Sequence, residues 1–287
     1  MRILAFGLLL LAACDRQADE GGATLEARPA AVTFDGGDYE TQTAKVAHGK
    51  RLASLFQCNS CHTPDYSGQD FGKGIPIVAG LWASNISRTM PMMSDAQLER
   101  LLRDGVHPNR HLYVMPSKQT HFLSNRDMAA LIAFLRTVPP VGELTPLPPE
   151  GFVEAVTARL PDDYWRTLQD GEKRSYHNAV EEVAYYAAHQ PPDLGAKLAR
   201  GRMIATSLCS TCHGASLDGV GEPAGNIQGA LAYDDPAFNR LLTRSIDRTG
   251  KQVAVEWGFG HEAYQLSAAE RRDVIAYVRA LARSRAK

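Results

Sequence analysis

The sequence predicts an all-α protein made of two tandem domains of similar design. The pattern Cys-x-x-Cys-His occurs twice, beginning at Cys58 and again at Cys209. A helix-like run precedes each copy, and a capped amphipathic helix follows each at a distance. A proline-rich stretch separates the two units, and 287 residues are enough for two domains of modest size.

The composition narrows the classes of function. The chain is 44% hydrophobic and 22% charged, with a formal net charge of -1, so no basic excess indicates a nucleic-acid partner. No low-complexity tract predicts disorder. A helix needs about 20 apolar residues to span a bilayer, and no stretch is that long. We therefore expect a globular protein that binds no nucleic acid.

The N-terminus predicts export. Arg2 precedes a short apolar run at residues 3–11, and small residues follow up to Cys14. This order predicts a secretory signal peptide over residues 1–13. Ala, Gly, Asp and Glu are frequent after it, so we expect residues 14–43 to form a flexible tether.

The residues around Cys14 are similar to the lipobox of bacterial lipoproteins, here Leu11-Ala12-Ala13-Cys14. The resemblance implies that cleavage leaves Cys14 at the new N-terminus with lipid attached to it. Several acyl chains, at about 0.8 kcal/mol per buried methylene, would anchor the protein on a membrane. Asp15 resembles the signal that retains such lipoproteins on the inner membrane, which implies its periplasmic face. The alternative is an ordinary signal peptide followed by a chance cysteine.

The four remaining cysteines form two identical frames, Cys58-Asn59-Ser60-Cys61-His62 and Cys209-Ser210-Thr211-Cys212-His213. Cys-x-x-Cys-His is the attachment site of c-type haem. Cysteines three residues apart on a helical turn share one face, where both sulfurs can bond the haem vinyl groups. The adjacent histidine can then bind the iron. The sequence therefore predicts two covalently bound haem c groups with His62 and His213 as iron ligands.

The sequence gives weaker support to two other uses of these cysteines, a zinc site and structural disulfides. A four-cysteine zinc site also uses two Cys-x-x-Cys pairs, but these pairs lie far apart in the sequence and each carries a histidine. Structural disulfides suit an exported protein. A Cys-x-x-Cys pair closes a very small loop, however, and is more typical of redox chemistry.

Matching helices frame each motif. Helix-like runs at residues 47–56 and 198–208 precede the motifs, and short amphipathic helices at 98–102 and 238–242 follow them. Each unit closes with a helix that begins at a capping box. The caps are Ser124 with Asp127 and Ser267 with Glu270. Apolar residues four apart behind each cap share one helical face and predict core packing.

Each unit thus resembles a small class I cytochrome c domain. The resemblance covers residues 44–140 and 195–284, which predicts domains at 44–140 and 195–287. The pair is similar to the dihaem cytochrome subunits that accept electrons from bacterial membrane-associated dehydrogenases. Residues 103–108 and 112–116 are similar to the alcohol-dehydrogenase cytochrome subunits in particular. The resemblance implies an N-terminal helix crossed by a C-terminal helix, and a distal methionine in the loop before the latter.

Met115 is the expected distal ligand of the first haem, because it lies in the loop where the resemblance places that methionine. A thioether ligand favours ferrous iron and raises the reduction potential. The cluster Met90, Met92 and Met93 is the alternative. Met128 belongs to the closing helix, where core packing is the default.

The second unit departs from this pattern, because no methionine follows Cys212. Alignment with the first unit puts the ligand position at Val255 or Gly258, and neither can bind iron. His261 is the only histidine after His213, and a neutral imidazole is a good metal ligand. We expect a second haem bound by His213 and His261. An open or water-bound iron, or another ligand, remains the alternative.

The rest of the chain carries weaker signals. Residues 141–194 form a linker with a semi-rigid, proline-rich start and one expected bridging helix over residues 172–189. Two arginines, Arg88 and Arg110, are candidates to neutralise haem propionates. Four further histidines have polar neighbours and are expected at the surface or in loops: His48, His107, His111 and His121.

Together these observations predict a periplasmic, membrane-anchored dihaem cytochrome c that carries single electrons. The expected donor is a dehydrogenase, and the expected acceptor is another cytochrome, the quinone pool or a terminal oxidase. No substrate-converting constellation is evident, so an enzyme is not expected. The alternatives are a dihaem peroxidase-like enzyme and a haem sensor, both of which would need an open second haem.

Overall fold

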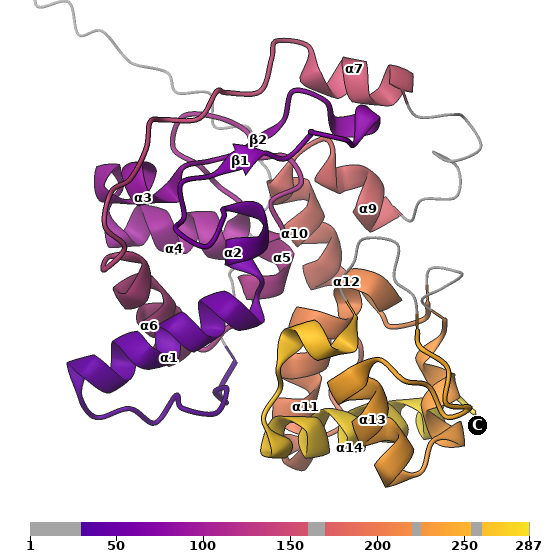
Figure 1. Cartoon of the computed structure of the whole chain (residues 1–287). Helices are drawn as coiled ribbons and strands as arrows, with labels where there is room; N and C mark the ends of the chain where they lie inside the picture. Colours follow the sequence, from indigo (N-terminus) through magenta and orange to yellow (C-terminus); the bar gives the residue numbers. More distant parts are fainter. Residues whose placement is uncertain (1–29, 160–169, 220–224, 254–259, 287) are drawn as a thin grey trace, which may run out of the picture.

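The computed structural model describes residues 30–159, 170–219, 225–253 and 260–286. Regular structure in these ranges is mostly helical, and the expected all-α fold of two tandem domains is confirmed. Figure 1 shows the two domains as separate groups of helices. The expected signal peptide, Cys14, Val255 and Gly258 lie outside the described residues. In the described part of the chain, no helix has the length and apolar character needed to cross a membrane.

The first domain begins with α1 (Gln42–Leu55), which leads into α2 (Cys58–Cys61) at the first motif. A small antiparallel pair, β1 (Gln69–Asp70) and β2 (Trp82–Ala83), follows the motif. Four short helical turns and two longer helices complete the domain: η1 (Pro76–Val78), α3 (Ile86–Thr89), η2 (Met90–Met92), α4 (Asp95–Asp104), α5 (Ser117–Thr120) and the closing helix α6 (Asn125–Leu135).

The second domain differs from the first in how its motif is joined to the helix before it. Here α11 (Ala199–Ile204) continues through a π-helical turn, η4 (Ala205–Cys209), into α12 (Ser210–His213), so that the second motif lies within a single helical run. The other elements are η3 (Ala196–Leu198), η5 (Ile227–Ala232), α13 (Asp235–Arg244), η6 (His261–Tyr264) and the closing helix α14 (Ala268–Arg285).

In both domains the first and last helices pack together at a glycine. A Cβ atom on Gly49 of α1 would lie 1.9 Å from the carbonyl oxygen of Ala130 in α6. A Cβ atom on Gly201 of α11 would lie 2.1 Å from the carbonyl oxygen of Asp273 in α14. The two backbones can approach this closely only because glycine has no side chain.

The two closing helices differ at their caps. Ser267 and Glu270 form the complete capping box that the sequence predicts. In α6, the Ser124 hydroxyl accepts from the Asp127 N–H, but the Asp127 carboxylate does not return to the Ser124 backbone. It instead accepts from the His48 Nε2 at 2.7 Å and from the Phe34 N–H at 3.1 Å. The predicted cap is therefore confirmed for the Ser124 hydroxyl, but the return bond is not made to the Ser124 N–H: the Asp127 carboxylate accepts from the Ser124 hydroxyl at 2.8 Å and from the two distant donors.

The linker contains more structure than expected. It includes α7 (Phe152–Arg159), α9 (Asp170–Ser175) and α10 (Ala179–Ala188). The prediction of one helix over residues 172–189 is wrong, because Asn178 starts a new helix there. Its side chain accepts from the Val180 N–H, and asparagine readily replaces helical backbone bonds in this way.

The helix α10 and the residues after it connect the two domains. On the first domain, Glu182 of α10 pairs with Lys118 of α5 at 2.8 Å, and both side chains are buried. On the second domain, Arg202 donates to the Pro191 carbonyl and the Tyr277 hydroxyl donates to the Pro192 carbonyl, each at 2.8 Å. The linker is therefore held at both ends.

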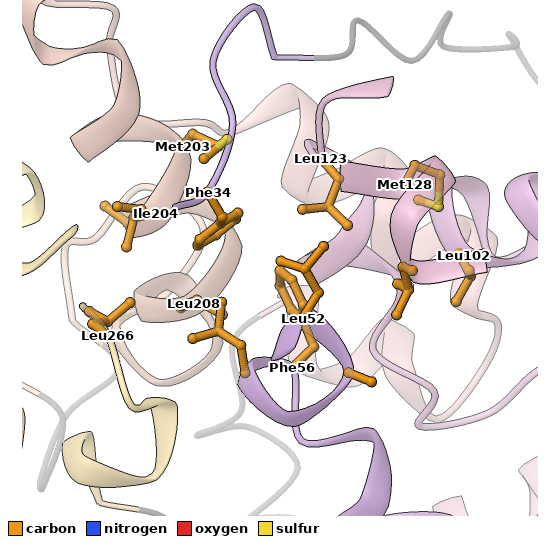
Figure 2. Packing of buried hydrophobic residues seen from close by; sticks show 14 of the residues in the cluster. Phe34, Leu52, Phe56, Leu102, Leu123, Met128, Met203, Ile204, Leu208 and Leu266 are labelled. Carbon is orange, nitrogen blue, oxygen red and sulfur yellow. The ribbon is translucent and has the colours of Figure 1, made fainter. Parts of the chain in front are cut away.

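The hydrophobic core is continuous between the domains. Figure 2 shows Leu52 of α1 and Phe56, which follows α1, in one cluster with Ile204 and Leu208 of the second domain. Phe34, which is only 1% exposed, belongs to the same cluster. The expectation of a flexible tether over residues 14–43 is therefore wrong from residue 30 onward, because burial of this apolar side chain offsets the entropy of ordering the segment.

Two of the four histidines expected at the surface or in loops are buried, and one of them, His121, lies in the turn that follows α5. His48 and His121 are each 4% exposed. His48 donates to Asp127, and the His121 Nδ1 donates to the Arg103 carbonyl at 2.8 Å. Each ring is accommodated because a distant part of the chain supplies its hydrogen-bond partner, which polar neighbours in the sequence did not indicate.

Candidate functional site

The first motif lies at the turn between α1 and α2. Gln57 adopts a left-handed conformation with φ of 57° and turns the chain, so that Cys58 begins a new helix. The Nδ1 of His62 donates a hydrogen bond to the Ser84 carbonyl at 2.7 Å. Nε2 is therefore the ring nitrogen available to a metal, as is usual for histidine ligands. Burial lowers the pKa of His62, which keeps the imidazole neutral.

A pocket of about 950 Å³, open solvent at its mouth included, adjoins this motif. It is lined by the residues of the predicted site, namely Cys58, Cys61, His62 and Met115. Apolar side chains from α3, α4 and α6, among them Ile86, Leu102 and Leu135, form much of its wall. A concave, largely apolar space with few polar groups is typical of cofactor sites.

Met115 is one of three methionines at this pocket. Met90 and Met93 also line it, whereas Met92 is 74% exposed and Met128 is 1% exposed within the core. The loop that carries Met115 is held by the linker, because the Val114 N–H donates to the Ser175 carbonyl at 2.7 Å and the Ala179 N–H to the Leu112 carbonyl at 2.9 Å. The linker therefore contributes to the site, which its sequence did not indicate.

The two candidate arginines have different positions. Arg110 lines the pocket and donates to the Ser84 hydroxyl at 2.7 Å. Ser84 therefore contacts both His62, through its carbonyl, and Arg110. Arg88 is exposed and donates to the Gly142 carbonyl at 2.9 Å instead. This role of Ser84 depends on the fold of the segment around β2.

The second motif has a similar local geometry. The Nδ1 of His213 donates to the Gly225 carbonyl at 2.8 Å, so that Nε2 is again the nitrogen available to a metal. Burial lowers the pKa of His213. Cys209 and Cys212 are partly buried on the helical run that carries them.

His261, at the start of η6, lies near His213. The two ring centroids are 6.2 Å apart and the ring planes are inclined by 36°. A bond from imidazole nitrogen to a metal is about 2 Å long, so this separation is compatible with one metal ion between the rings. The His261 Nδ1 is buried without a hydrogen-bond partner among the described residues. Burial, and then the nearby His213, lower the pKa of His261 to about 4, so the ring is neutral at pH 7.

The alternative uses of the cysteines find no support in the described residues. Among the described residues, Cys58, Cys61, Cys209 and Cys212 form no disulfide. In the described ranges, no three His, Cys, Asp or Glu side chains gather as a metal site, so the two pairs do not combine into a zinc centre. Burial raises the pKa of Cys58 and of Cys209 to about 12, which favours the neutral sulfur over a metal-binding thiolate.

The fold and its two Cys-x-x-Cys-His sites define a class of helical haem proteins that transfer electrons. A model of the family described as Cytochrome c matches residues 46–139 and 198–282, which together are more than half of the chain. The chain therefore belongs to the cytochrome c family. A comparison with curated proteins finds no match. Family membership supports an electron-transfer haem protein with redox protein partners.

The residues present fit covalently attached haem at both motifs. At the first, two thiols, a neutral imidazole and a thioether border one apolar pocket. At the second, the buried His261 Nδ1 has no hydrogen-bond partner among the described residues, and its ring lies near that of His213. When bound, haem supplies a one-electron couple at its iron, which is the chemistry of this family.

Proposed function

We propose that this protein is a periplasmic, membrane-anchored dihaem cytochrome c that carries single electrons between a donor such as a dehydrogenase and the respiratory chain. The observation that carries the proposal is the repeated arrangement at His62 and His213. Each histidine follows a Cys-x-x-Cys pair and donates its Nδ1 proton to a backbone carbonyl. In each case Nε2 is left for the iron.

In the first domain we assign Cys58 and Cys61 to haem attachment, and His62 and Met115 to the iron. The position of Met115 at the same pocket as His62 supports this assignment. The loop that carries Met115 is braced by backbone bonds from the linker. Such bracing would hold the thioether sulfur at a constant distance during reduction and oxidation, which suits a carrier.

In the second domain we assign Cys209 and Cys212 to haem attachment, and His213 and His261 to the iron. The proximity of the two rings and the unpaired Nδ1 of His261 support this assignment. A pair of neutral imidazoles does not favour ferrous iron as a thioether does, so the second haem would have the lower potential.

The membrane anchor is assigned to Cys14. This assignment is supported by the sequence before and after it. Replacement of Cys14 by Ser should release the protein from washed membranes. Retention of the variant on membranes would mean that lipid on Cys14 is not the only anchor.

The experiment that tests the proposal is a haem count followed by a carbon monoxide difference spectrum on the reduced full-length protein. Two covalent haems per chain with no carbon monoxide binding would support two six-coordinate irons and an electron carrier. Fewer than two haems would contradict the dihaem assignment. Carbon monoxide binding at one haem, together with rapid turnover of hydrogen peroxide, would instead favour a peroxidase-like enzyme.

A further inference from the structure

The segment of residues 30–40, called the interdomain strap here, runs along the junction of the two domains. Its contacts with the first domain are made largely by its backbone. The Ala30 N–H donates to the Phe122 carbonyl at 3.3 Å. Arg126 of α6 donates to the carbonyls of Gly37 and Tyr39, each at 2.7 Å.

Two buried carboxylates at equivalent positions receive successive N–H groups of the strap. The Phe34 N–H donates to Asp127 at 3.1 Å, and the Asp35 N–H donates to Glu270 at 2.9 Å. Asp127 and Glu270 each occupy the third position of their closing helix, one in each domain, and both are fully buried. The strap therefore adds a hydrogen bond to a buried carboxylate in each domain, beside those that His48 and Ser124 give to Asp127 and that Arg51 gives to Glu270.

Side chains of the strap strengthen the junction. The Asp35 carboxylate accepts from Arg200 and from Ser267, both of the second domain. The Phe34 ring packs edge to face on Phe56 with centroids 5.8 Å apart. Figure 2 shows Phe34 in the shared cluster with Ile204 of α11. Since α1 leads to the first motif and α11 to the second, the strap links the two helices that precede the motifs.

The two candidate haem sites also contact one another across this junction. Gln57, which precedes Cys58, donates to the Ala263 carbonyl at 2.7 Å, and Ala263 lies in the same turn as His261. Gln119, in the helix that follows Met115, donates to the Thr211 hydroxyl of the second motif at 2.7 Å. The residue before the first motif therefore contacts the turn that carries His261, and the second motif contacts the helix that follows Met115. Both contacts exist only while the two domains are docked.

We propose that the interdomain strap is a positioning element for electron transfer between the two haem sites within one chain. The proposal rests on the proposed function. By binding an equivalent carboxylate in each domain, the strap keeps the two sites at one separation. With haem bound at both motifs, one electron would pass from the ferrous iron at one site to the ferric iron at the other. No bond forms or breaks, and no proton moves.

The test compares the full-length protein with the Asp35→Ala variant. A one-electron photoreductant is flashed, and the rate of electron redistribution between the two haems is followed by absorbance. We expect this rate, which is proportional to the docked fraction, to fall about tenfold in Asp35→Ala. Small-angle scattering should show an expanded molecule.

Asp38→Ala is the matched control, because Asp38 is an exposed acid of the strap that makes no hydrogen bond or ion pair among the described residues. It should behave as the wild type. Asp35→Asn, which keeps the size of the side chain, provides a second variant should Asp35→Ala not fold. Unchanged rate and scattering in the Asp35 variants, with two haems per chain, would overturn the strap proposal alone. Fewer than two haems in the wild-type protein would instead overturn the proposed function.

Discussion

Met115 differs from its neighbouring methionines in how it is held. Met90 and Met93 line the same pocket but are almost fully buried, whereas Met115 is partly exposed on a loop. Backbone hydrogen bonds to the linker hold that loop in place. A side chain at the border of the pocket, on a loop held in place, is better suited to bind a metal than one that fills the core, which is the default role of methionine.

We therefore expect Met115→Ala to lower the higher midpoint potential without loss of covalent haem, because a thioether stabilises ferrous iron. A spectroscopic redox titration measures this. Met92→Ala, at an exposed position, is the control and should leave the titration unchanged. If Met93→Ala lowered the potential and Met115→Ala did not, the assignment of Met115 would be wrong.

His121 should make stability depend on pH. Burial is the largest cause of its lowered pKa, so the folded state binds fewer protons than the unfolded state below the ordinary value of 6.5. The stabilisation is complete above that value and is lost as the pH falls toward the folded-state pKa, by at most about 1.4 kcal/mol per pH unit.

Urea unfolding at about pH 7.5 and about pH 5 tests this for the wild type and for His121→Asn, which keeps an N–H donor for the Arg103 carbonyl. The fall in unfolding free energy between the two pH values should be smaller in the variant, because the contribution of His121 is removed. Equal falls in both proteins would show that His121 does not contribute.

At the scale of elements, the crossing of first and last helices depends on one small residue in each domain. In the second domain Gly201 meets the Asp273 carbonyl, which is backbone and cannot move aside easily. Alanine is the better helix former by about 1 kcal/mol. The crowding has the larger effect, because overpacking a tight contact costs about 1–3 kcal/mol and backbone contacts lie at the upper end.

We expect Gly201→Ala to lower the unfolding free energy by about 2 kcal/mol, measured by urea titration. Gly229→Ala is the control, since a Cβ atom there would meet nothing within 4 Å. Its effect should stay within about 0.5 kcal/mol. A Gly201→Ala protein as stable as the wild type would mean that the helices can separate without cost.

At the scale of the whole molecule, the shared core predicts that both domains unfold together. Phe34 is nearly fully buried between them, so Phe34→Ala should cost about 3–5 kcal/mol. Denaturant titration with one probe in each domain is the measurement. Coincident transitions are expected in the wild type and separated transitions in the variant. Separated transitions in the wild type would contradict a common core.

The sequence by itself determined the fold class, the two motifs and the helices around them. These features are local: a Cys-x-x-Cys-His frame, the serine caps and the helical period are each contained within a few consecutive residues. The proximity of His213 and His261 was foreseen from chain order and chemistry rather than from any local pattern, since 48 positions separate them in the sequence.

Only the tertiary structure decided the roles of Phe34, Asp35, Ser84 and Asp127. Each acts through a partner far along the chain: Asp127 binds the strap and His48 in addition to its own cap residue Ser124, and Ser84 supports His62 by its carbonyl. The physical reason is that buried carboxylates, carbonyls and apolar rings take whichever partner the packing brings within reach. Such partners leave no periodic signal in the sequence, so residues 30–40 resembled a tether until their contacts were known.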